Sequence, residues 1–139
     1  MNFISNFNWR PTLSGIALSL LLATGCAQRH NTLSEQEIAD GWELLFDGKT
    51  LDAWKDYNGD SLTMPWRAVD GCIQAHGDGS DLSGYIVTRK QYENFILDWD
   101  WKLSYGGNSG MLYHVLEDPY FKVPYVTGPE YQLIDNDGW

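Results

Sequence analysis

Alternation of apolar and polar residues is the dominant pattern of the chain from residue 41 onward. The segment NFILDWDWKL, residues 94–103, has an apolar residue at every second position, which puts the apolar side chains on one face of a strand. Glycine and other turn residues separate this segment from similar ones. The pattern predicts an all-β fold of the sandwich type.

Shorter segments of the same character predict the remaining strands. They are WELLF (42–46), PWRAVDGCIQAHG (65–77) around a turn at Asp70 and Gly71, GYIVT (84–88), MLYHVL (111–116) and EYQLID (130–135). The cluster GGNSG at 106–110 is typical of a turn. One helix of a turn or two is expected within 34–40, because Ser34 and Glu37 have the spacing of a capping box.

The first 25 residues have the organisation of an export signal. Arg10 precedes the apolar run LSGIALSLLLA, which is too short to span a bilayer as a helix. The next residues, LLATGCAQ, resemble a bacterial lipobox whose usual leucine is displaced by one place, with Cys26 as the lipidated residue. We expect a lipoprotein signal peptide at 1–25, a polar tether at 26–40 and the domain at 41–139. An ordinary secretory signal with an incidental cysteine is the alternative.

A lipoprotein signal predicts an exported protein that is lipid-anchored in the cell envelope, in the periplasm or at the outer membrane. Ala27 after the lipidated cysteine, rather than an aspartate, favours the outer membrane. If Cys26 carries the lipid, Cys72 has no partner for an internal disulfide, so the core must hold the fold.

The charge balance is acidic. Residues 26–139 hold 8 Lys and Arg against 19 Asp and Glu, a formal charge of −11, because Arg10 is the one charged residue of the first 25. Nucleic acid binding needs a basic face, so the charge argues against a nucleic acid partner.

Polar residues interrupt the last expected strand, EYQLID. With a period of two, Glu130 and Gln132 share one face with Ile134, while Asp135 lies on the other face. An edge strand with a solvated face and a polar functional site are both compatible with this pattern. Glu130 and Asp135 are poor partners for ordinary two-carboxylate glycoside cleavage, because five residues of strand separate their backbones by about 16 Å, whereas such carboxylate pairs lie roughly 5–9.5 Å apart.

Other residues that carry chemistry are sparse. His114 falls on an expected strand, where a single histidine is more often structural than catalytic. The cysteines and histidines lack the spacing of a zinc motif, and neither a phosphate loop nor the GxSxG element of esterases occurs. A catalytic site here would need one base, helped by hydrogen-bond donors or a metal.

An ordered set of motifs runs through the domain. The motifs are GWELLFDGKTLDAWK (41–55), PWRAVDGCI (65–73), GGNSGMLYHV (106–115) and GPEYQLIDN (128–136). Together they closely resemble the 3-keto-disaccharide hydrolase domain family; Cys72 stands where that family commonly has valine, and DWDW is a minor variant of its strand pattern. The resemblance implies a concanavalin-like jelly roll. Family domains continue for several strands beyond the D-N element, so we expect an N-terminal fragment, incomplete at the C-terminus and poorly stable alone.

The resemblance also implies a substrate. Characterised members cleave 3-keto-glucosides or 3-keto-disaccharides, which a partner sugar 3-oxidoreductase has oxidised at C3. The ketone acidifies the C2 proton, so one base and a stabilised enolate let the glycosidic oxygen leave from C1, after which water adds. A divalent metal on the keto group is compatible with this chemistry, but the sequence establishes no cofactor.

The family motifs assign candidate site residues position by position. Glu130 and Gln132 fall on the E-x-Q element, Asp135 on D-N, Asn108 and Ser109 on N-S-G, and His114 where the family often has His or Arg. We expect Glu130 to be the base or a metal-side ligand and His114 the acid or enolate partner. The other four are expected to bind the sugar or support the site. The competing hypothesis is a non-catalytic jelly-roll module that binds a glycan through Trp and Tyr.

Overall fold

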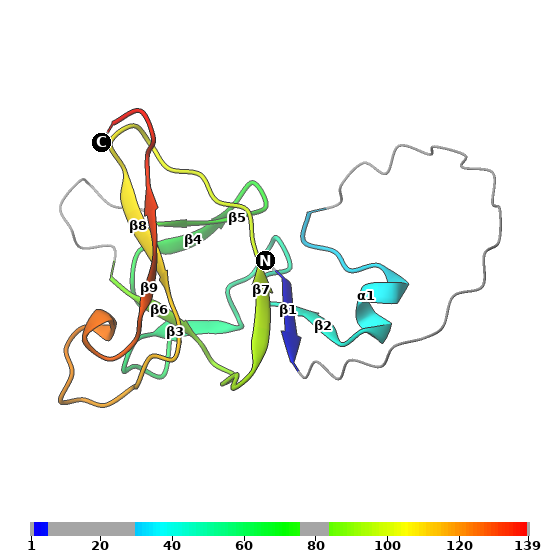
Figure 1. The fold of residues 1–139 in the computed structure, drawn as a ribbon, viewed down its shortest axis with the longest axis horizontal. Coiled ribbons are helices and arrows are strands. Elements are labelled where there is room, and N and C mark those ends of the chain that lie inside the picture. Colours follow the sequence, from blue (N-terminus) through cyan, green and yellow to red (C-terminus); the bar gives the residue numbers. More distant parts are fainter. Residues whose placement is uncertain (1, 6–29, 76–83, 139) are drawn as a thin grey trace.

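The computed structural model describes residues 2–5, 30–75 and 84–138. Strands dominate this part of the chain (Figure 1). The elements are β1 (Asn2–Ser5), α1 (Glu35–Ala39), β2 (Trp42–Leu44), β3 (Trp54–Asp56), β4 (Trp66–Val69), β5 (Cys72–Ala75), β6 (Ile86–Thr88), β7 (Phe95–Asp98), β8 (Asn108–Leu112), the 3₁₀ helix η1 (Pro124–Val126) and β9 (Glu130–Ile134). The β-rich content agrees with the predicted all-β class.

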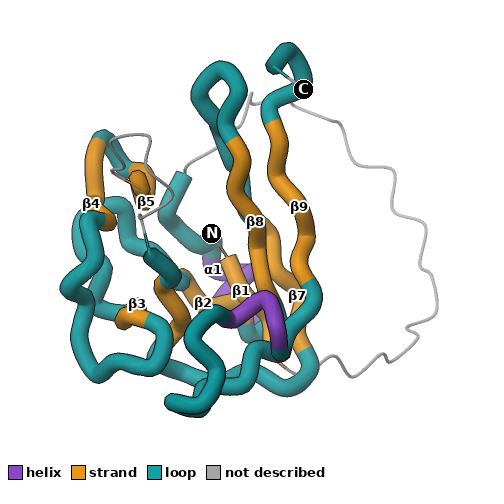
Figure 2. Tube along the Cα trace, turned by 90° about the vertical axis from the view of Figure 1, so that its left-hand side faces the viewer, coloured by secondary structure: helices purple, strands orange, loops and turns teal. Residues whose placement is uncertain are grey.

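The strands form small antiparallel sheets. β1 lies between β2 and β7, while β3 pairs with β6, β4 with β5, and β8 with β9. Figure 2 shows the β8–β9 pair along one side of the molecule and β4 and β5 along the other. Sheets of this size do not by themselves define a jelly roll, so that arrangement stays a prediction. The assignments of the signal peptide, which includes β1, and of the tether also stay predictions, and Cys26 lies outside the described residues.

Two local features form where the sequence predicts them. Asp70 and Gly71 have φ of 49° and 74°, and positive φ at both central residues is the conformation that joins two strands through a two-residue turn. At the start of α1, the Ser34 side chain accepts a hydrogen bond from the Glu37 backbone, and the Glu37 side chain accepts one from the Ser34 backbone. This capping box is confirmed.

β7 and β8 depart most from their predicted bounds, and β3 was not predicted as a strand. β7 ends at Asp98, not at residue 103, although the alternating pattern continues. β8 covers Asn108–Leu112, so three of the five residues of the predicted turn cluster are strand and the predicted strand end at 113–116 is not. His114 has a φ of 52°, a left-handed conformation that is incompatible with an extended strand.

The buried core is centred on Leu45 and Trp54, which are 4% and 6% exposed. The Trp54 indole nitrogen donates a hydrogen bond of 2.7 Å to the carbonyl oxygen of Leu45. Partly buried apolar residues pack around this pair: Leu51, Ala53, Ile73, Ile86, Tyr92, Phe95 and Leu97. Leu133 of β9 is also buried, so one face of β9 is turned toward the interior.

A buried carboxylate fixes the chain that follows β3. Asp56 is 7% exposed and accepts hydrogen bonds from the backbone nitrogens of Thr63 and Met64, at 2.9 and 3.2 Å, and from the Thr63 hydroxyl. Burial acts to raise the pKa of Asp56, but these hydrogen bonds outweigh it, and the pKa lies below its ordinary value. Asp56, Thr63 and Met64 are called the Asp56 cluster below.

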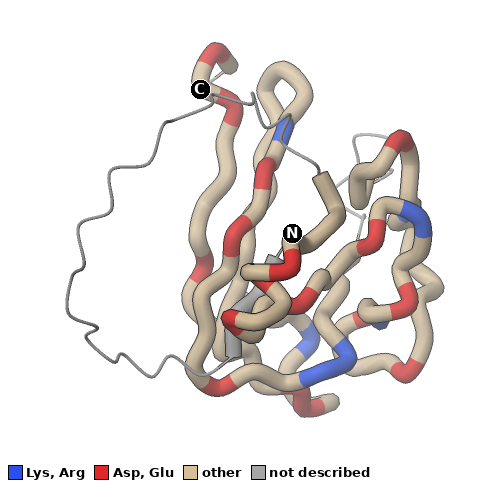
Figure 3. Tube along the Cα trace, turned by 90° about the vertical axis from the view of Figure 1, so that its right-hand side faces the viewer, with Lys and Arg blue, Asp and Glu red and all other residues tan. Residues whose placement is uncertain are grey.

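Acidic positions are spread along the whole described trace (Figure 3). Among the helices of that trace, none has the length and apolar character needed to cross a membrane.

Candidate functional site

The register of β8 and β9 gathers three predicted site residues on one face. Residues directly opposite each other in an antiparallel pair share a face. Gly110 lies opposite Gln132, Leu112 opposite Glu130, and Asn108 opposite Ile134. Glu130, Gln132 and Asn108 therefore share the face of β9 that Leu133 does not occupy, and all three are exposed. We call these three residues the Glu130 face.

The two amides of this face hold each other in place. The Gln132 side-chain nitrogen donates to the Asn108 side-chain oxygen and, at 3.1 Å, to the carbonyl oxygen of Ser109. Within the described part of the chain, neither amide side chain makes a further hydrogen bond. The Gln132 side-chain oxygen and the Asn108 side-chain nitrogen are therefore an acceptor and a donor that a ligand can use.

The Glu130 side chain lies directly over Gly110. A Cβ atom built on Gly110 would stand 1.7 Å from Glu130 Oε1, so any side chain at residue 110 would displace the carboxylate. No hydrogen bond or ion pair joins Glu130 to another described residue. Strand pairing thus sets the position of Glu130, and its carboxylate has no polar partner in the part of the chain that the structure describes, which is a suitable state for a base or a ligand-binding group.

Gly110 is a site residue that the sequence analysis missed. Its sequence neighbours are typical of a turn cluster, whereas Gly110 lies inside β8. A glycine in the interior of a paired strand often marks a close approach by another group. That signal becomes readable once the pairing of β8 with β9 is known.

Ser109 and Asp135 are placed away from the Glu130 face. Ser109 lies opposite Leu133, so its side chain belongs to the face that is turned inward. Asp135 follows β9; its carboxylate accepts a 2.9 Å hydrogen bond from the backbone nitrogen of Gly106, and its own backbone nitrogen donates to the carbonyl oxygen of Gly107 at 3.0 Å. Asp135 thus closes the end of the β8–β9 pair that is farther from Glu130.

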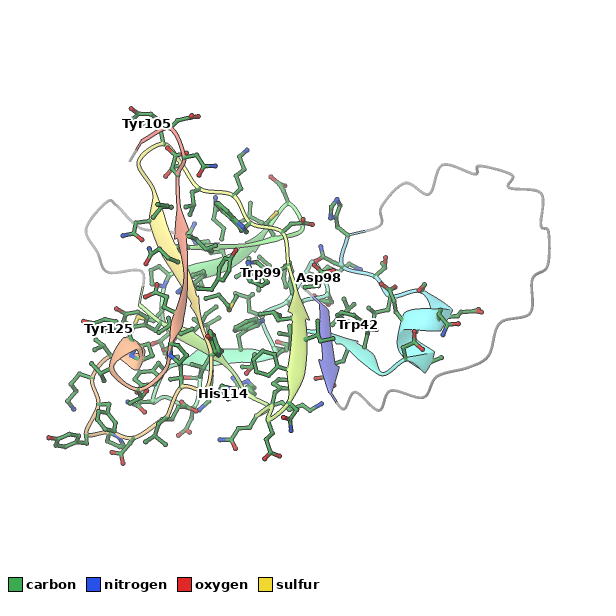
Figure 4. All side chains as sticks on the ribbon, viewed as in Figure 1. Trp42, Asp98, Trp99, Tyr105, His114 and Tyr125 are labelled. Carbon is green, nitrogen blue, oxygen red and sulfur yellow. The ribbon has the colours of Figure 1, made fainter. Side chains whose placement is uncertain are left out.

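His114 is not brought together with Glu130 by any contact of the described residues. Its ring lies 5.8 Å from the ring of Phe95 in β7 and 5.7 Å from that of Tyr113, measured between centroids. In Figure 4 it lies on the chain that leaves β8, while Trp99 lies between β7 and the β8–β9 pair. The Trp99 ring meets the Tyr131 ring of β9 edge-on at 5.6 Å between centroids.

No metal site is evident in the part of the chain that the structure describes. None of its His, Cys, Asp and Glu side chains form a group of three or more that could hold an ion. The Glu130 face itself offers one carboxylate and two amides.

The domain is similar to a known protein family. The model of the 3-keto-alpha-glucoside-1,2-lyase-like domain matches residues 41–139. The chain belongs to this family. The match spans the segment that the sequence motifs assign to the domain, and it confirms the resemblance inferred from them.

Two relatives of this 3-keto-alpha-glucoside-1,2-lyase-like domain extend the comparison. A 3-keto-disaccharide hydrolase from Bacteroides thetaiotaomicron is 36% identical over 112 residues, which cover 71% of this chain and 39% of the relative. The crystal structure of a candidate glycosyl hydrolase from Parabacteroides distasonis is 49% identical, with a TM-score of 0.69 over 80% of this chain and 49% of that chain. The chain spans less than half the length of each relative. The names of the two relatives support a hydrolase family for the domain.

Proposed function

We propose that the protein containing this domain cleaves the glycosidic bond of 3-keto-glucosides or 3-keto-disaccharides, with Glu130 as the base. Family membership and the name of the Bacteroides relative support the substrate class. The observation that carries the choice of base is the Glu130 carboxylate itself. It is exposed and unpaired among the described residues, lies over Gly110, and has two amide groups on the same face.

The proposed reaction is an elimination followed by hydration. Glu130 removes the proton from C2, and the electron pair of that C–H bond forms the enolate with the C3 ketone. The enolate then collapses to the ketone, and a double bond forms between C1 and C2. In the same step the glycosidic oxygen leaves C1 with the electron pair of the broken bond and takes up a proton. Water adds its hydroxyl to C1 and its proton to C2. The Asn108 side-chain nitrogen is suited to stabilise the enolate oxygen.

Further roles follow from the family positions. We propose that His114 acts as the acid toward the leaving oxygen or as a partner of the enolate. Gln132 would bind a sugar hydroxyl through its free oxygen, Ser109 would support Gln132 through its carbonyl, and Asp135 would hold the end of the strand pair. A divalent metal on the ketone remains compatible with this mechanism.

The test is cleavage of a chromogenic 3-keto-glucoside by the full-length protein, beside the unoxidised parent compound. We expect turnover of the keto compound alone and a loss of roughly 100-fold or more in kcat for Glu130→Gln. Glu93→Gln, which removes an exposed carboxylate outside the Glu130 face, is the matched control and should retain activity. A chelator shows whether a metal takes part. Glycan binding without turnover of either compound would support a carbohydrate-binding module instead.

The cellular setting is a second part of the proposal. We propose export, lipid attachment at Cys26, and a sugar 3-oxidoreductase that supplies the oxidised substrate. Cys26→Ser should move the protein from the membrane fraction to the soluble fraction, and unchanged retention in the membrane would contradict the anchor.

The fold of the whole domain is the third part. We propose that the small sheets belong to a concanavalin-like jelly roll, the fold that the family resemblance implies; the family model matches residues 41–139. A crystal structure of the full-length protein would test this.

A further inference from the structure

The loop between β8 and β9 is tied to the chain around β3 by hydrogen bonds that all run in one direction. Every donor lies in 55–58 and every acceptor in 116–121. Glu117 Oε1 accepts from Lys55 Nζ at 2.8 Å and from the Asn58 backbone nitrogen at 3.0 Å. Tyr57 Oη donates to the Leu116 carbonyl at 2.8 Å. Asn58 Nδ2 donates to the carbonyls of Asp118 and Phe121, at 3.1 and 2.8 Å. We call this set the loop clamp. Figure 1 shows this loop passing beside β3.

Asn58 has a backbone conformation that serves the clamp. Its φ is 58°, in the left-handed region that asparagine tolerates better than most residues. In this conformation its backbone nitrogen and its side-chain nitrogen both donate to the loop. The donor segment is held from its other side as well, because the neighbouring Asp56 cluster fixes the chain from 56 to 64.

Glu117 is the matching acceptor on the loop. One of its carboxylate oxygens accepts hydrogen bonds from Lys55 Nζ and from the Asn58 backbone nitrogen. The Glu117 side chain is 27% exposed and the Lys55 side chain 19% exposed. A partly buried ion pair that also accepts a backbone hydrogen bond has a more fixed geometry than an exposed pair. Glu117 therefore holds the loop at a defined position relative to β3.

A second group of hydrogen bonds carries this position to the start of β9. The Leu116 nitrogen donates to the Thr127 hydroxyl at 3.1 Å, and the Tyr113 nitrogen donates to the Pro129 carbonyl at 3.1 Å. Gly128 is buried, and a Cβ atom there would lie 2.5 Å from the Tyr113 carbonyl oxygen, so the two ends of the loop are in close contact. Pro129 directly precedes Glu130, so the loop fixes the residue before the proposed base.

We propose that Glu117 and Asn58 are positioning residues, which hold the loop and thereby keep the Glu130 carboxylate in its place over Gly110. They do not touch the reacting atoms in this account. The proposal rests on the proposed function, because it assigns Glu130 as the base. It predicts a defect in kcat and not in substrate affinity, because the Gln132 and Asn108 amides remain in place.

The experiment compares Glu117→Ala, Glu117→Gln and Asn58→Gly in the full-length protein. The glutamine keeps an acceptor oxygen, and the glycine keeps the left-handed backbone while removing the side-chain donor. We expect Glu117→Ala to lower kcat on the 3-keto-glucoside by on the order of ten- to a hundredfold with little change in KM. Glu117→Gln should recover most of that loss, and Asn58→Gly should lie between the two.

The matched control is Glu43→Ala, which breaks another lysine–glutamate pair, with Lys90, on a strand outside the clamp. This variant should keep the kcat of the parent at temperatures where all variants are folded. A kcat of Glu117→Ala equal to that of Glu43→Ala would overturn the proposal, and so would a loss confined to KM. If Glu117→Ala does not fold, Asn58→Gly decides by the same criterion. Failure of the proposed function looks different, because the parent protein would then show no turnover or Glu130→Gln would retain it.

Discussion

Two carboxylates in this chain have opposite surroundings. Asp56, next to the core, is buried and receives three hydrogen bonds from Thr63 and Met64. Glu130, on the β8–β9 pair, is exposed and receives none from the described residues, and its side chain lies over Gly110. A carboxylate whose acceptor capacity is used within the protein serves the fold, whereas a placed but unpaired carboxylate is available to a ligand. Stability and activity should therefore respond to different substitutions.

The largest effect is expected from crowding Glu130. Gly110→Ala would put a methyl group where the carboxylate now lies. The cleavage rate of the 3-keto-glucoside should fall about 100-fold, because a displacement of about 1 Å of a reacting group can cost that much. The unfolding midpoint should change little, since the displaced atoms are the end of a flexible, exposed side chain. Full activity in this variant would show that the carboxylate does not need its place over residue 110.

The next effect concerns mainly stability. Asp56→Ala leaves the donors of Thr63 and Met64 without their acceptor, so the free energy of unfolding should fall by about 2–3 kcal/mol. The kcat of the remaining folded protein should fall far less than in Gly110→Ala, because Asn58 keeps its own hydrogen bonds to the loop. Asp60→Ala, an exposed aspartate in the same loop, is the control and should keep the parent's stability. Chemical denaturation of the full-length Asp56→Ala and Asp60→Ala proteins measures their free energies of unfolding. An equal loss of stability in the two variants would contradict the structural role of Asp56.

A pH dependence follows from the lowered pKa of Asp56. Since the unfolded chain takes up this proton at a higher pH than the folded one, the carboxylate stabilises the fold above its unfolded pKa. That contribution is lost as the pH falls through about 4 and below. Unfolding midpoints measured between about pH 6 and about pH 3 should decline less steeply in Asp56→Asn than in the parent. Parallel curves for the two proteins would contradict the assignment.

The smallest effect is expected from the amide beside the base. Gln132→Ala removes one hydrogen bond to a sugar hydroxyl, worth about 1 kcal/mol, so KM should rise roughly fivefold with kcat little changed. The substitution also removes the hydrogen bond that Gln132 donates to the Asn108 side chain. A fall in kcat as large as that of Gly110→Ala would contradict the prediction, because it would mean that Gln132 orients Asn108 toward the enolate.

Local chemistry explains which parts of the fold could be predicted. The turn at Asp70 and Gly71 and the cap at Ser34 depend on a few neighbouring residues, and both were predicted correctly. Residues 99–103 alternate as a strand does, yet β7 ends at Asp98, because a strand also needs a pairing partner that its own sequence does not reveal. β3 was missed because two of its three residues, Lys55 and Asp56, are charged, so it lacks the apolar character of the equally short β2 and β6.

The candidate site divides in the same way. The shared face of Glu130 and Gln132 follows from the period of a strand, and the structure places them so. Asn108 was assigned only through the family resemblance, and its contact with Gln132 depends on the register between two segments far apart in the sequence. The place of Gly110 under Glu130 depends on the same register. Pairing across sequence distance is the information that one sequence lacks.

The most direct test of the account is to follow the C2 proton. The full-length protein and its Glu130→Gln variant are given a 3-keto-glucoside that carries deuterium or hydrogen at C2, and the cleavage rates are compared. The account predicts slower cleavage of the deuterated substrate by the parent protein and almost no cleavage by the variant, with the two proteins equally folded. Equal rates for both isotopes together with undiminished turnover by Glu130→Gln would contradict it.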